Sequence, residues 1–137
     1  MLHSLLVKDY MEASLVTFKP DQEVLDAIRL LLENNISGAP VIDQLGNMCG
    51  MLSEKDCLRV ALNCSYHGEL GGKISEFMSP NVVTVDIDDS VLEVAKLFLE
   101  NPFKCYPVVT DNRLVGMITR HDVLRAIEHV SQEQTYP

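Results

Sequence analysis

The chain repeats itself, and this internal repeat limits its possible folds more than any other feature. Shifting the sequence by 67 positions aligns residues 9–42 with residues 76–109, and about a third of the aligned residues are identical. A shift of 66 positions then aligns GMLSEKD with GMITRHD. A period of this size indicates that one supersecondary unit occurs twice. We therefore expect a first repeat at 7–62, a glycine-containing linker at 63–73 and a second repeat at 74–130.

Both repeats have the same order of predicted elements. A short extended stretch (LVTF or VVTV) precedes an acidic helix start, where Asp21 or Asp88 is the expected N-cap. Two β runs separated by a polar turn follow, and the quoted motif then opens a closing helix. The order predicts a mixed α+β fold of two β-α-β-β-α repeats. We expect the repeats to be related by pseudo-two-fold symmetry and packed sheet to sheet into one module.

The first helix of each repeat shows apolar residues at helical spacing. Asparagine stop signals at Asn34 and Asn101 mark the expected helix ends. The expected apolar faces are Val24, Leu25, Ile28, Leu31 and Leu32 in the first copy, and Val91, Leu92, Ala95, Phe98 and Leu99 in the second.

Charge and composition exclude several classes of protein. A net charge of −9 and a pI of about 4.7 argue against binding to nucleic acid or to an anionic membrane. No apolar run approaches the roughly 18 residues of a membrane span. The N-terminal stretch MLHSLLVKDYME is charged too early for a signal peptide. We therefore expect a cytoplasmic protein, and the spacing of its four cysteines and four histidines predicts neither a disulfide nor a metal site.

The repeated motif places a hydroxyl residue three positions before an aspartate: Ser53 with Asp56, and Thr119 with Asp122. One interpretation is a capping box, in which the hydroxyl accepts from a free backbone N–H and the acid returns a hydrogen bond. Such a cap stabilises a helix by roughly 1 kcal/mol. The alternative interpretation is a binding site, and the two are compatible at one position.

Three features favour a binding site at the motif. A glycine and two apolar residues precede each hydroxyl, which places it at the end of a buried strand, where α/β proteins commonly bind ligands. The start of the following helix offers unpaired N–H groups that suit a phosphate. An acid one turn into such a helix can accept the hydrogen bonds of a ribose cis-diol. The motif therefore contains the parts of a nucleoside phosphate site.

The doubled pattern resembles a pair of cystathionine-β-synthase (CBS) domains, known as a Bateman module, here as a stand-alone protein. The resemblance rests on M-x-x-x-x-x-V-T (Met11 to Thr17 and Met78 to Thr84), on SGAPVID and KCYPVVTD, and on the two motifs. It covers about residues 7–62 and 74–130. No single piece is specific, but their order, repeated twice, is.

The resemblance implies an adenosine ligand (AMP, ADP, ATP, S-adenosylmethionine or NAD) in a cleft between the repeats. In such proteins the motif aspartate holds the ribose hydroxyls and the motif hydroxyl lies near the phosphates. Carried over, this implies one site at Thr17, Ser37, Gly38, Ala39, Pro40, Ser53 and Asp56. It implies another at Thr84, Lys104, Cys105, Tyr106, Pro107, Thr119 and Asp122, with Arg120 and His121 of the motif beside them.

The two candidate sites differ chemically. The first carries Glu54 inside its motif, and a carboxylate beside a phosphate lowers affinity. The second carries Lys104, Arg120 and His121, so the Asp122 site is the better candidate for a nucleotide. Two alternatives stay open: Tyr106 is a core aromatic or a base-stacking residue, and Lys104, Arg120 and Arg125 are ligand contacts or solvated surface charges.

These observations favour a regulatory module, not an enzyme. The family resemblance implies a homodimer that forms through its helices, and a separate effector protein would read the bound state. The alternative is a structural or interaction protein with no bound nucleotide. Catalysis has little support, because no nucleophile–base order and no paired carboxylates are recognisable.

Overall fold

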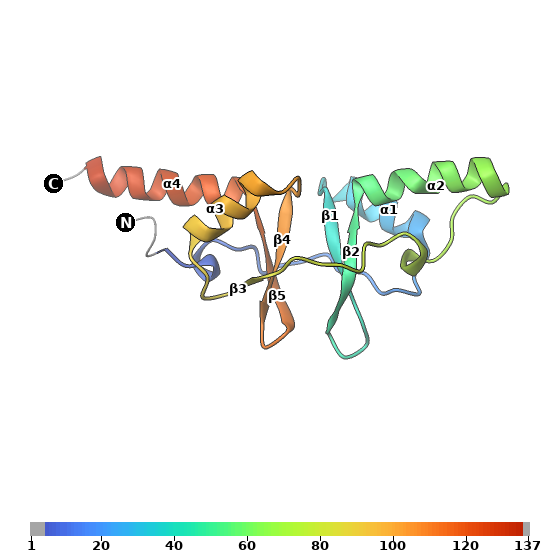
Figure 1. Cartoon of the computed structure of the whole chain (residues 1–137), viewed down its shortest axis with the longest axis horizontal. Coiled ribbons are helices and arrows are strands. Elements are labelled where there is room, and N and C mark those ends of the chain that lie inside the picture. Colours follow the sequence, from blue (N-terminus) through green and yellow to red (C-terminus); the bar gives the residue numbers. More distant parts are fainter. Residues whose placement is uncertain (1–4, 136–137) are drawn as a thin grey trace. The chain divides into compact units, whose positions relative to one another are not determined.

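The computed structural model describes residues 5–135 of the chain. The secondary structure follows the order predicted from the repeat (Figure 1). The elements are the 3₁₀ turn η2 (Val7–Asp9), α1 (Val24–Glu33), β1 (Gly38–Ile42), β2 (Met48–Ser53), α2 (Glu54–His67), the 3₁₀ turn η3 (Ile74–Glu76), β3 (Val85–Asp86), α3 (Val91–Glu100), β4 (Cys105–Thr110), β5 (Arg113–Thr119) and α4 (Arg120–Thr135).

Each repeat contributes one β-hairpin. Strands β1 and β2 pair antiparallel, as do β4 and β5, and each ladder contains one register shift near its turn. In the second repeat β3 joins the sheet parallel to β4. In the first repeat the corresponding stretch makes a single parallel bridge between Phe18 and Val41. The mixed α+β fold is therefore confirmed, with one short edge strand reduced to a bridge.

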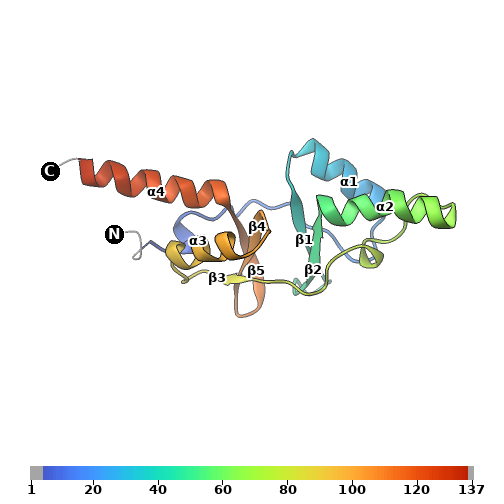
Figure 2. The same cartoon turned by 45° about the horizontal axis from the view of Figure 1, so that its top comes forward.

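The chain divides into two compact units, and the boundaries of these units differ from the boundaries of the two sequence repeats. The central unit is Val16–Val82. The split unit joins the described residues up to Leu15 with those from Val83 onward. In each unit the two helices lie at one end of the hairpin and the hairpin turn lies at the other (Figures 1 and 2). The opening segment of each repeat therefore packs on the body of the other repeat.

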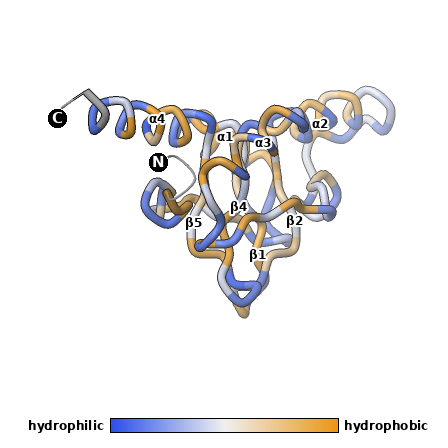
Figure 3. Tube along the Cα trace, turned by 60° about the vertical axis from the view of Figure 1, so that its left-hand side comes forward, coloured by the Kyte–Doolittle hydropathy of each residue, from blue (hydrophilic) through white to orange (hydrophobic). Residues whose placement is uncertain are grey.

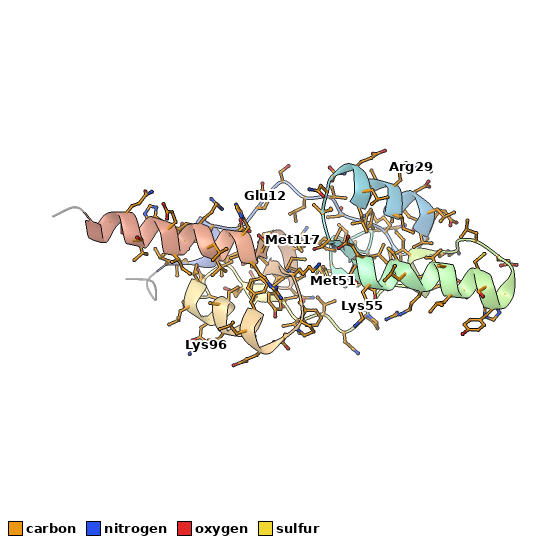
Figure 4. The ribbon with its side chains drawn as sticks, turned by 90° about the horizontal axis from the view of Figure 1, so that it is seen from above. Glu12, Arg29, Met51, Lys55, Lys96 and Met117 are labelled. Carbon is orange, nitrogen blue, oxygen red and sulfur yellow. The ribbon has the colours of Figure 1, made fainter. Side chains whose placement is uncertain are left out.

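The two opening segments dock in the same way. In the central unit, backbone N–H groups of Met51 and Ser79 donate to each other's carbonyls, both at 2.9 Å. In the split unit Met117 and Glu12, both labelled in Figure 4, exchange the same pair of bonds at 2.9 and 2.8 Å.

The glycine of each motif makes room for this docked segment. A Cβ on Gly50 would lie 2.7 Å from the Ser79 carbonyl oxygen. A Cβ on Gly116 would lie 2.7 Å from the Met11 sulfur and 3.0 Å from the Glu12 carbonyl oxygen. The glycines of GMLSEKD and GMITRHD are therefore explained by close backbone approach.

Each unit has its own cluster of buried apolar side chains, which drives its folding. The central cluster is Phe18, Val24, Ala27, Leu31, Ala39, Val41, Leu52, Val60, Ile74 and Phe77. The split cluster is Val7, Val85, Val91, Val94, Phe98, Tyr106, Val108, Ile118, Val123 and Ala126.

The N-caps predicted for the first helices are wrong. Helix α3 begins after Ser90, whose hydroxyl accepts from the Glu93 N–H at 3.2 Å. Helix α1 begins after Glu23, which makes no side-chain cap and instead accepts from the Gly72 N–H at 2.9 Å. Asp21 and Asp88 are exposed. Each aspartate lies two residues before the observed N-cap, in the turn that precedes the helix.

Two further expectations about helices differ from the structure. The inner faces of α1 and α3 bury Val24, Ala27 and Leu31, and Val91, Val94 and Phe98. Leu32 and Leu99, expected on those faces, are 74% and 88% exposed. The predicted linker at 63–73 is helical over 63–67, and α2 ends at Gly68 with φ of 73°. A left-handed residue of this kind is the common terminator of a helix.

Within residues 5–135, no helix is long and apolar enough to span a membrane. The four cysteines are free thiols, each of them half-buried. No group of three His, Cys, Asp or Glu residues in this part of the chain is placed to hold a metal.

Candidate functional site

The repeated motif forms the corner where a hairpin strand ends and the closing helix begins. Ser53 is the last residue of β2 and the N-cap of α2. Its hydroxyl accepts from the Asp56 N–H at 3.1 Å, and the Asp56 carboxylate accepts from the Ser53 N–H at 3.0 Å. The capping box is confirmed. We call this arrangement the central corner.

Thr119 and Asp122 form the same arrangement in the split unit, which we call the split corner. The Thr119 hydroxyl accepts from the Asp122 N–H at 3.2 Å, and the Thr119 N–H donates to Asp122 Oδ2 at 2.9 Å. Both motif aspartates are buried, Asp56 with 3% and Asp122 with 6% of their surface exposed. They are the two buried charged residues among those described. Each corner therefore holds one buried carboxylate whose position is fixed by hydrogen bonds.

An arginine one turn further along the helix joins each aspartate to the docked segment. Arg59 lies 3.4 Å from Asp56 Oδ1 and donates to the Phe77 carbonyl at 3.4 Å. Arg125 donates to Asp122 Oδ1 at 3.2 Å and to the Tyr10 carbonyl at 2.9 Å. Its guanidinium also lies 5.9 Å from the centre of the Tyr10 ring. Arg125 is thus more than a solvated surface charge, because it anchors the N-terminal segment.

The strand pairing brings several predicted site residues to the corners. Gly38 is paired with Ser53, and Cys105 is paired with Thr119. Thr84 lies just before the start of β3. Because β3 runs parallel to β4, Thr84 lies toward the end of the sheet where β4 begins. Thr17 likewise precedes the bridge at Phe18, and the Ser37 carbonyl accepts from the Glu54 N–H at 2.9 Å. Ala39, Pro40 and Pro107 are buried within β1 and β4.

Tyr106 is a core aromatic. Its ring packs against Phe98 and Phe103, with centroids 4.8 and 5.9 Å apart, and 1% of the residue is exposed. Its hydroxyl donates to the Leu97 carbonyl at 2.9 Å, and burial raises the pKa of the phenol. Of the two alternatives drawn from the sequence, the structure supports packing.

The polar side chains around the two corners differ in charge. Arg120, His121 and Lys104 are exposed beside the split corner, and Arg120 donates to the Phe103 carbonyl at 3.3 Å. At the central corner Glu54 and Lys55 occupy the first turn of α2, where Figure 4 labels Lys55. The split corner therefore carries more positive charge.

A hollow of about 400 Å³ lies between α1 and α2 in the central unit. Its lining is mostly apolar and includes one predicted site residue, Ser37. The other lining residues are Ile28, Leu31, Leu32, Asn35, Ile36, Glu54, Cys57 and Leu58.

The comparison with known proteins agrees with this geometry. The model of the CBS domain matches residues 7–63 and again residues 74–129, which together make up most of the chain. The chain belongs to the CBS domain family. It carries the domain twice, as a tandem pair or Bateman module. CBS-domain proteins of this kind are typically regulatory and not catalytic.

Related proteins show the fold and some of the ligands of the family. A structure of CBSX2 in complex with AMP has a TM-score of 0.83 and 32% identity, and the match covers 93% of this chain and 98% of that one. CBSX2 is a protein of Arabidopsis thaliana. The CBS pair of protein MJ0100 in complex with 5′-methylthioadenosine and S-adenosylmethionine has a TM-score of 0.75 and 27% identity, over 91% and 97% of the two chains.

A curated relative is considerably longer than this chain. The uncharacterised protein MJ1225 of Methanocaldococcus jannaschii is 27% identical over 121 residues, which are 88% of this chain and 42% of that protein. The chain therefore spans less than half the length of that relative.

Sequence reasoning missed the side chains that complete each corner. Ser79 donates its hydroxyl to Asp56 Oδ1 at 3.0 Å from 23 positions away in the chain. Nothing local in the sequence indicates that contact. The identity of Arg59 and Arg125 in the repeat, three residues after each aspartate, was a usable signal for the ion pairs.

Proposed function

We propose that this chain is a regulatory, non-catalytic module that binds an adenosine nucleotide of the AMP, ADP or ATP class at its motif corners. The observation that carries the proposal is the fixed, buried carboxylate at the start of α2 and again at the start of α4. A buried carboxylate that is held by neighbouring donors is pre-organised to accept further hydrogen bonds from a sugar diol.

The ligands in the related structures support this assignment. AMP, 5′-methylthioadenosine and S-adenosylmethionine share an adenosine with a ribose cis-diol, whereas only AMP carries a phosphate. The shared part is therefore the nucleoside, and the motif aspartate has the chemistry to bind its diol. We assign the phosphate side to Arg120, His121 and Lys104 at the split corner.

A bound nucleotide regulates only if it favours one arrangement of the protein over another. The arginines offer the physical route, because Arg125 contacts both Asp122 and the Tyr10 carbonyl of the docked segment. A cis-diol that donates both of its hydroxyls to Asp122 competes with Arg125 for the carboxylate and changes how firmly that segment is held. A separate effector protein would read the change.

Thermal unfolding with AMP, ADP, ATP, S-adenosylmethionine and NAD tests the proposal. At a ligand concentration 100-fold above Kd the stabilisation is roughly 2.7 kcal/mol, a rise in Tm on the order of 10 °C for a chain of this size. Asp122→Ala should remove most of the shift. Asp21→Ala is the matched control, because it removes an exposed carboxylate from a turn. If none of the five compounds raises Tm, the module does not bind adenosine ligands.

We also propose that two copies of the chain associate through their helices. Hydrophilic and hydrophobic residues alternate along α4 (Figure 3), and the helices keep large apolar side chains exposed to water. Equivalent positions of both repeats are affected, as Leu32 with Leu99 and Leu58 with Leu124 are 61–88% exposed. A like surface on both repeats suits a symmetric pair of copies.

Light scattering on the purified protein measures this association directly. Leu58→Glu places a charge on the helix face and should shift a dimer toward monomer. Leu45→Glu is the matched control, because Leu45 is 74% exposed, close to the 70% of Leu58, but lies in the β1–β2 turn. A monomeric wild-type protein at micromolar concentration would contradict the proposal.

A further inference from the structure

The two motif aspartates differ in how fully their oxygens are used. Asp56 Oδ2 accepts from the Ser53 N–H and hydroxyl, both at 3.0 Å. Asp56 Oδ1 accepts from the Ser79 hydroxyl at 3.0 Å and lies 3.4 Å from Arg59. A carboxylate has about four acceptor positions. At Asp56 the chain donates hydrogen bonds to three of them, and the Arg59 guanidinium lies against the fourth as an ion pair.

Asp122 keeps one acceptor position open. Its Oδ2 accepts from the Thr119 N–H at 2.9 Å and from the Thr119 hydroxyl at 3.1 Å, like its counterpart. Within residues 5–135, however, Oδ1 of Asp122 receives a hydrogen bond from Arg125 alone. The missing donor is the counterpart of the Ser79 hydroxyl.

The residue at the place of Ser79 in the split unit is Glu12. Glu12 pairs with Met117 through the same two backbone hydrogen bonds that join Ser79 to Met51. The two side chains therefore start from equivalent points beside the two corners. A carboxylate accepts hydrogen bonds and does not donate them, and within residues 5–135 the Glu12 side chain makes no hydrogen bond or ion pair.

We propose that Ser79 determines which corner takes the ribose: its hydroxyl closes the central corner, and Glu12 leaves the split corner open. The inference rests on the proposed function and adds a residue that sets its selectivity. Ser79 is a positioning residue, since it acts through Asp56. To bind a cis-diol at the central corner, Asp56 has to give up the Ser79 hydrogen bond, whereas Asp122 accepts one diol hydroxyl without losing a partner.

At Asp56 a diol hydroxyl only replaces the Ser79 hydroxyl, so the number of hydrogen bonds to the carboxylate does not rise. The affinities of the two corners for AMP should therefore differ by about the value of one net hydrogen bond to a charged group, roughly tenfold or more. We expect calorimetric titration with AMP to show a stronger step and a step at least about tenfold weaker. Asp122→Asn should remove the stronger step and Asp56→Asn the weaker one.

Exchanging the two residues tests the selectivity itself. Ser79→Ala should strengthen the weaker step about tenfold and leave the stronger step unchanged. Ser79→Thr keeps the hydroxyl and should behave like the wild-type protein. At the other corner, Glu12→Ser should bind AMP about tenfold more weakly than Glu12→Ala. Both Glu12 variants lose the same negative charge, so their difference isolates the new hydroxyl.

A ligand that lacks the diol separates this role from a structural one. Ser79→Ala should not improve the binding of 2′,3′-dideoxy-AMP, because that compound makes no demand on the Asp56 acceptors. A general loosening of the central unit would change both ligands alike. The thermal unfolding of Ser79→Ala, measured without ligand, establishes that the variant is folded.

The outcomes for the two proposals are distinct. Two equal AMP steps in the wild-type protein, or a Ser79→Ala variant whose weaker step is unchanged, would overturn this inference and leave the proposed function standing. The absence of any AMP binding would overturn the proposed function, and this inference with it.

Discussion

Three equivalent positions hold packed aromatic rings in one unit and smaller apolar residues beside a hollow in the other. In the split unit the rings of Phe98, Phe103 and Tyr106 pack together. The repeat places Leu31, Ile36 and Ala39 at the same three positions of the central unit, where Leu31 and Ile36 line a hollow of about 400 Å³. The two repeats share a backbone plan, but they distribute side-chain volume differently. Internal homology therefore predicts the helices and strands better than it predicts how their side chains pack.

Removing the tyrosine ring should have the largest effect on this comparison. Tyr106→Ala empties a buried site, and truncation of large aromatic residues costs about 3–5 kcal/mol. Urea unfolding measures the loss. Tyr106→Phe is the control, because it keeps the ring and loses only the hydrogen bond to the Leu97 carbonyl, worth about 1 kcal/mol. Equal losses in both variants would show that packing of the ring contributes little.

The motif glycines should separate the two units next. Gly50→Ala places a Cβ against the Ser79 carbonyl oxygen. Because a hydrogen-bonded backbone atom cannot easily move away, we expect the free energy of unfolding to fall by about 1–3 kcal/mol. Gly116→Ala should cost less, because its nearest neighbour is the flexible end of Met11. Denaturant midpoints of the two variants give the order. The reverse order would mean that the N-terminal segment is held more rigidly than segment 72–79.

The helix starts provide a smaller contrast. Ser90→Ala removes the N-cap of α3 and should cost about 1 kcal/mol. Asp21→Ala should change the free energy of unfolding by less than about 0.5 kcal/mol, because Asp21 is exposed and caps nothing. Thermal unfolding of the two variants measures both changes in stability. A larger loss for Asp21→Ala would restore the sequence-based N-cap.

The last contrast is chemical and concerns Cys57, whose counterpart in the second repeat is Val123. Burial, with the charges of Asp56 and Glu54, raises the pKa of the Cys57 thiol from 9.0 to about 11. At pH 8 the folded chain should then carry roughly 100-fold less thiolate at this position than the unfolded chain, and should be alkylated correspondingly slowly. Mass spectrometry of the native and the urea-unfolded protein after brief iodoacetamide treatment gives the ratio.

The sign of the pH effect follows from the raised pKa. The folded state binds the Cys57 proton more tightly than the unfolded state, so the contribution to stability is present below pH 9 and is lost as the pH rises toward 11. Cys57→Val should remove this loss, at a cost below about 1.5 kcal/mol. If the variant and the wild-type protein lose stability in parallel between pH 9 and 11, another group is responsible.

Much of the fold was predictable from the sequence because its signals are local. The apolar runs around Val41 and Val108, the polar turns after them and the asparagines that end α1 and α3 appear at the expected places. The N-caps were not predictable with the same reasoning, because Asp88 and Ser90 are both good capping residues and only the geometry of the turn selects between them.

The candidate site was predictable only in part. Its hydroxyl and carboxylate lie within one turn of the same helix, so their capping geometry follows from their spacing. Ser79 and Glu12 reach the corners through the docked segments, and a repeat seen in sequence does not say which copy a segment packs on. Tyr106 was ambiguous because a buried ring and a base-stacking ring look alike in a sequence.

The exchange of opening segments has a consequence for how the protein is made. All the residues of the central unit are contiguous, so they leave the ribosome together and can fold while the rest is still being synthesised. The split unit can fold only later, because its first segment is synthesised before Val16 and the segments it packs on are synthesised after Val82. Closing that unit joins segments separated by the whole central unit, a long-range step that favours slow folding. A circular permutant that begins at Val83 and joins the old termini would make the split unit contiguous as well, and it should reverse the order in which the two halves of the molecule form.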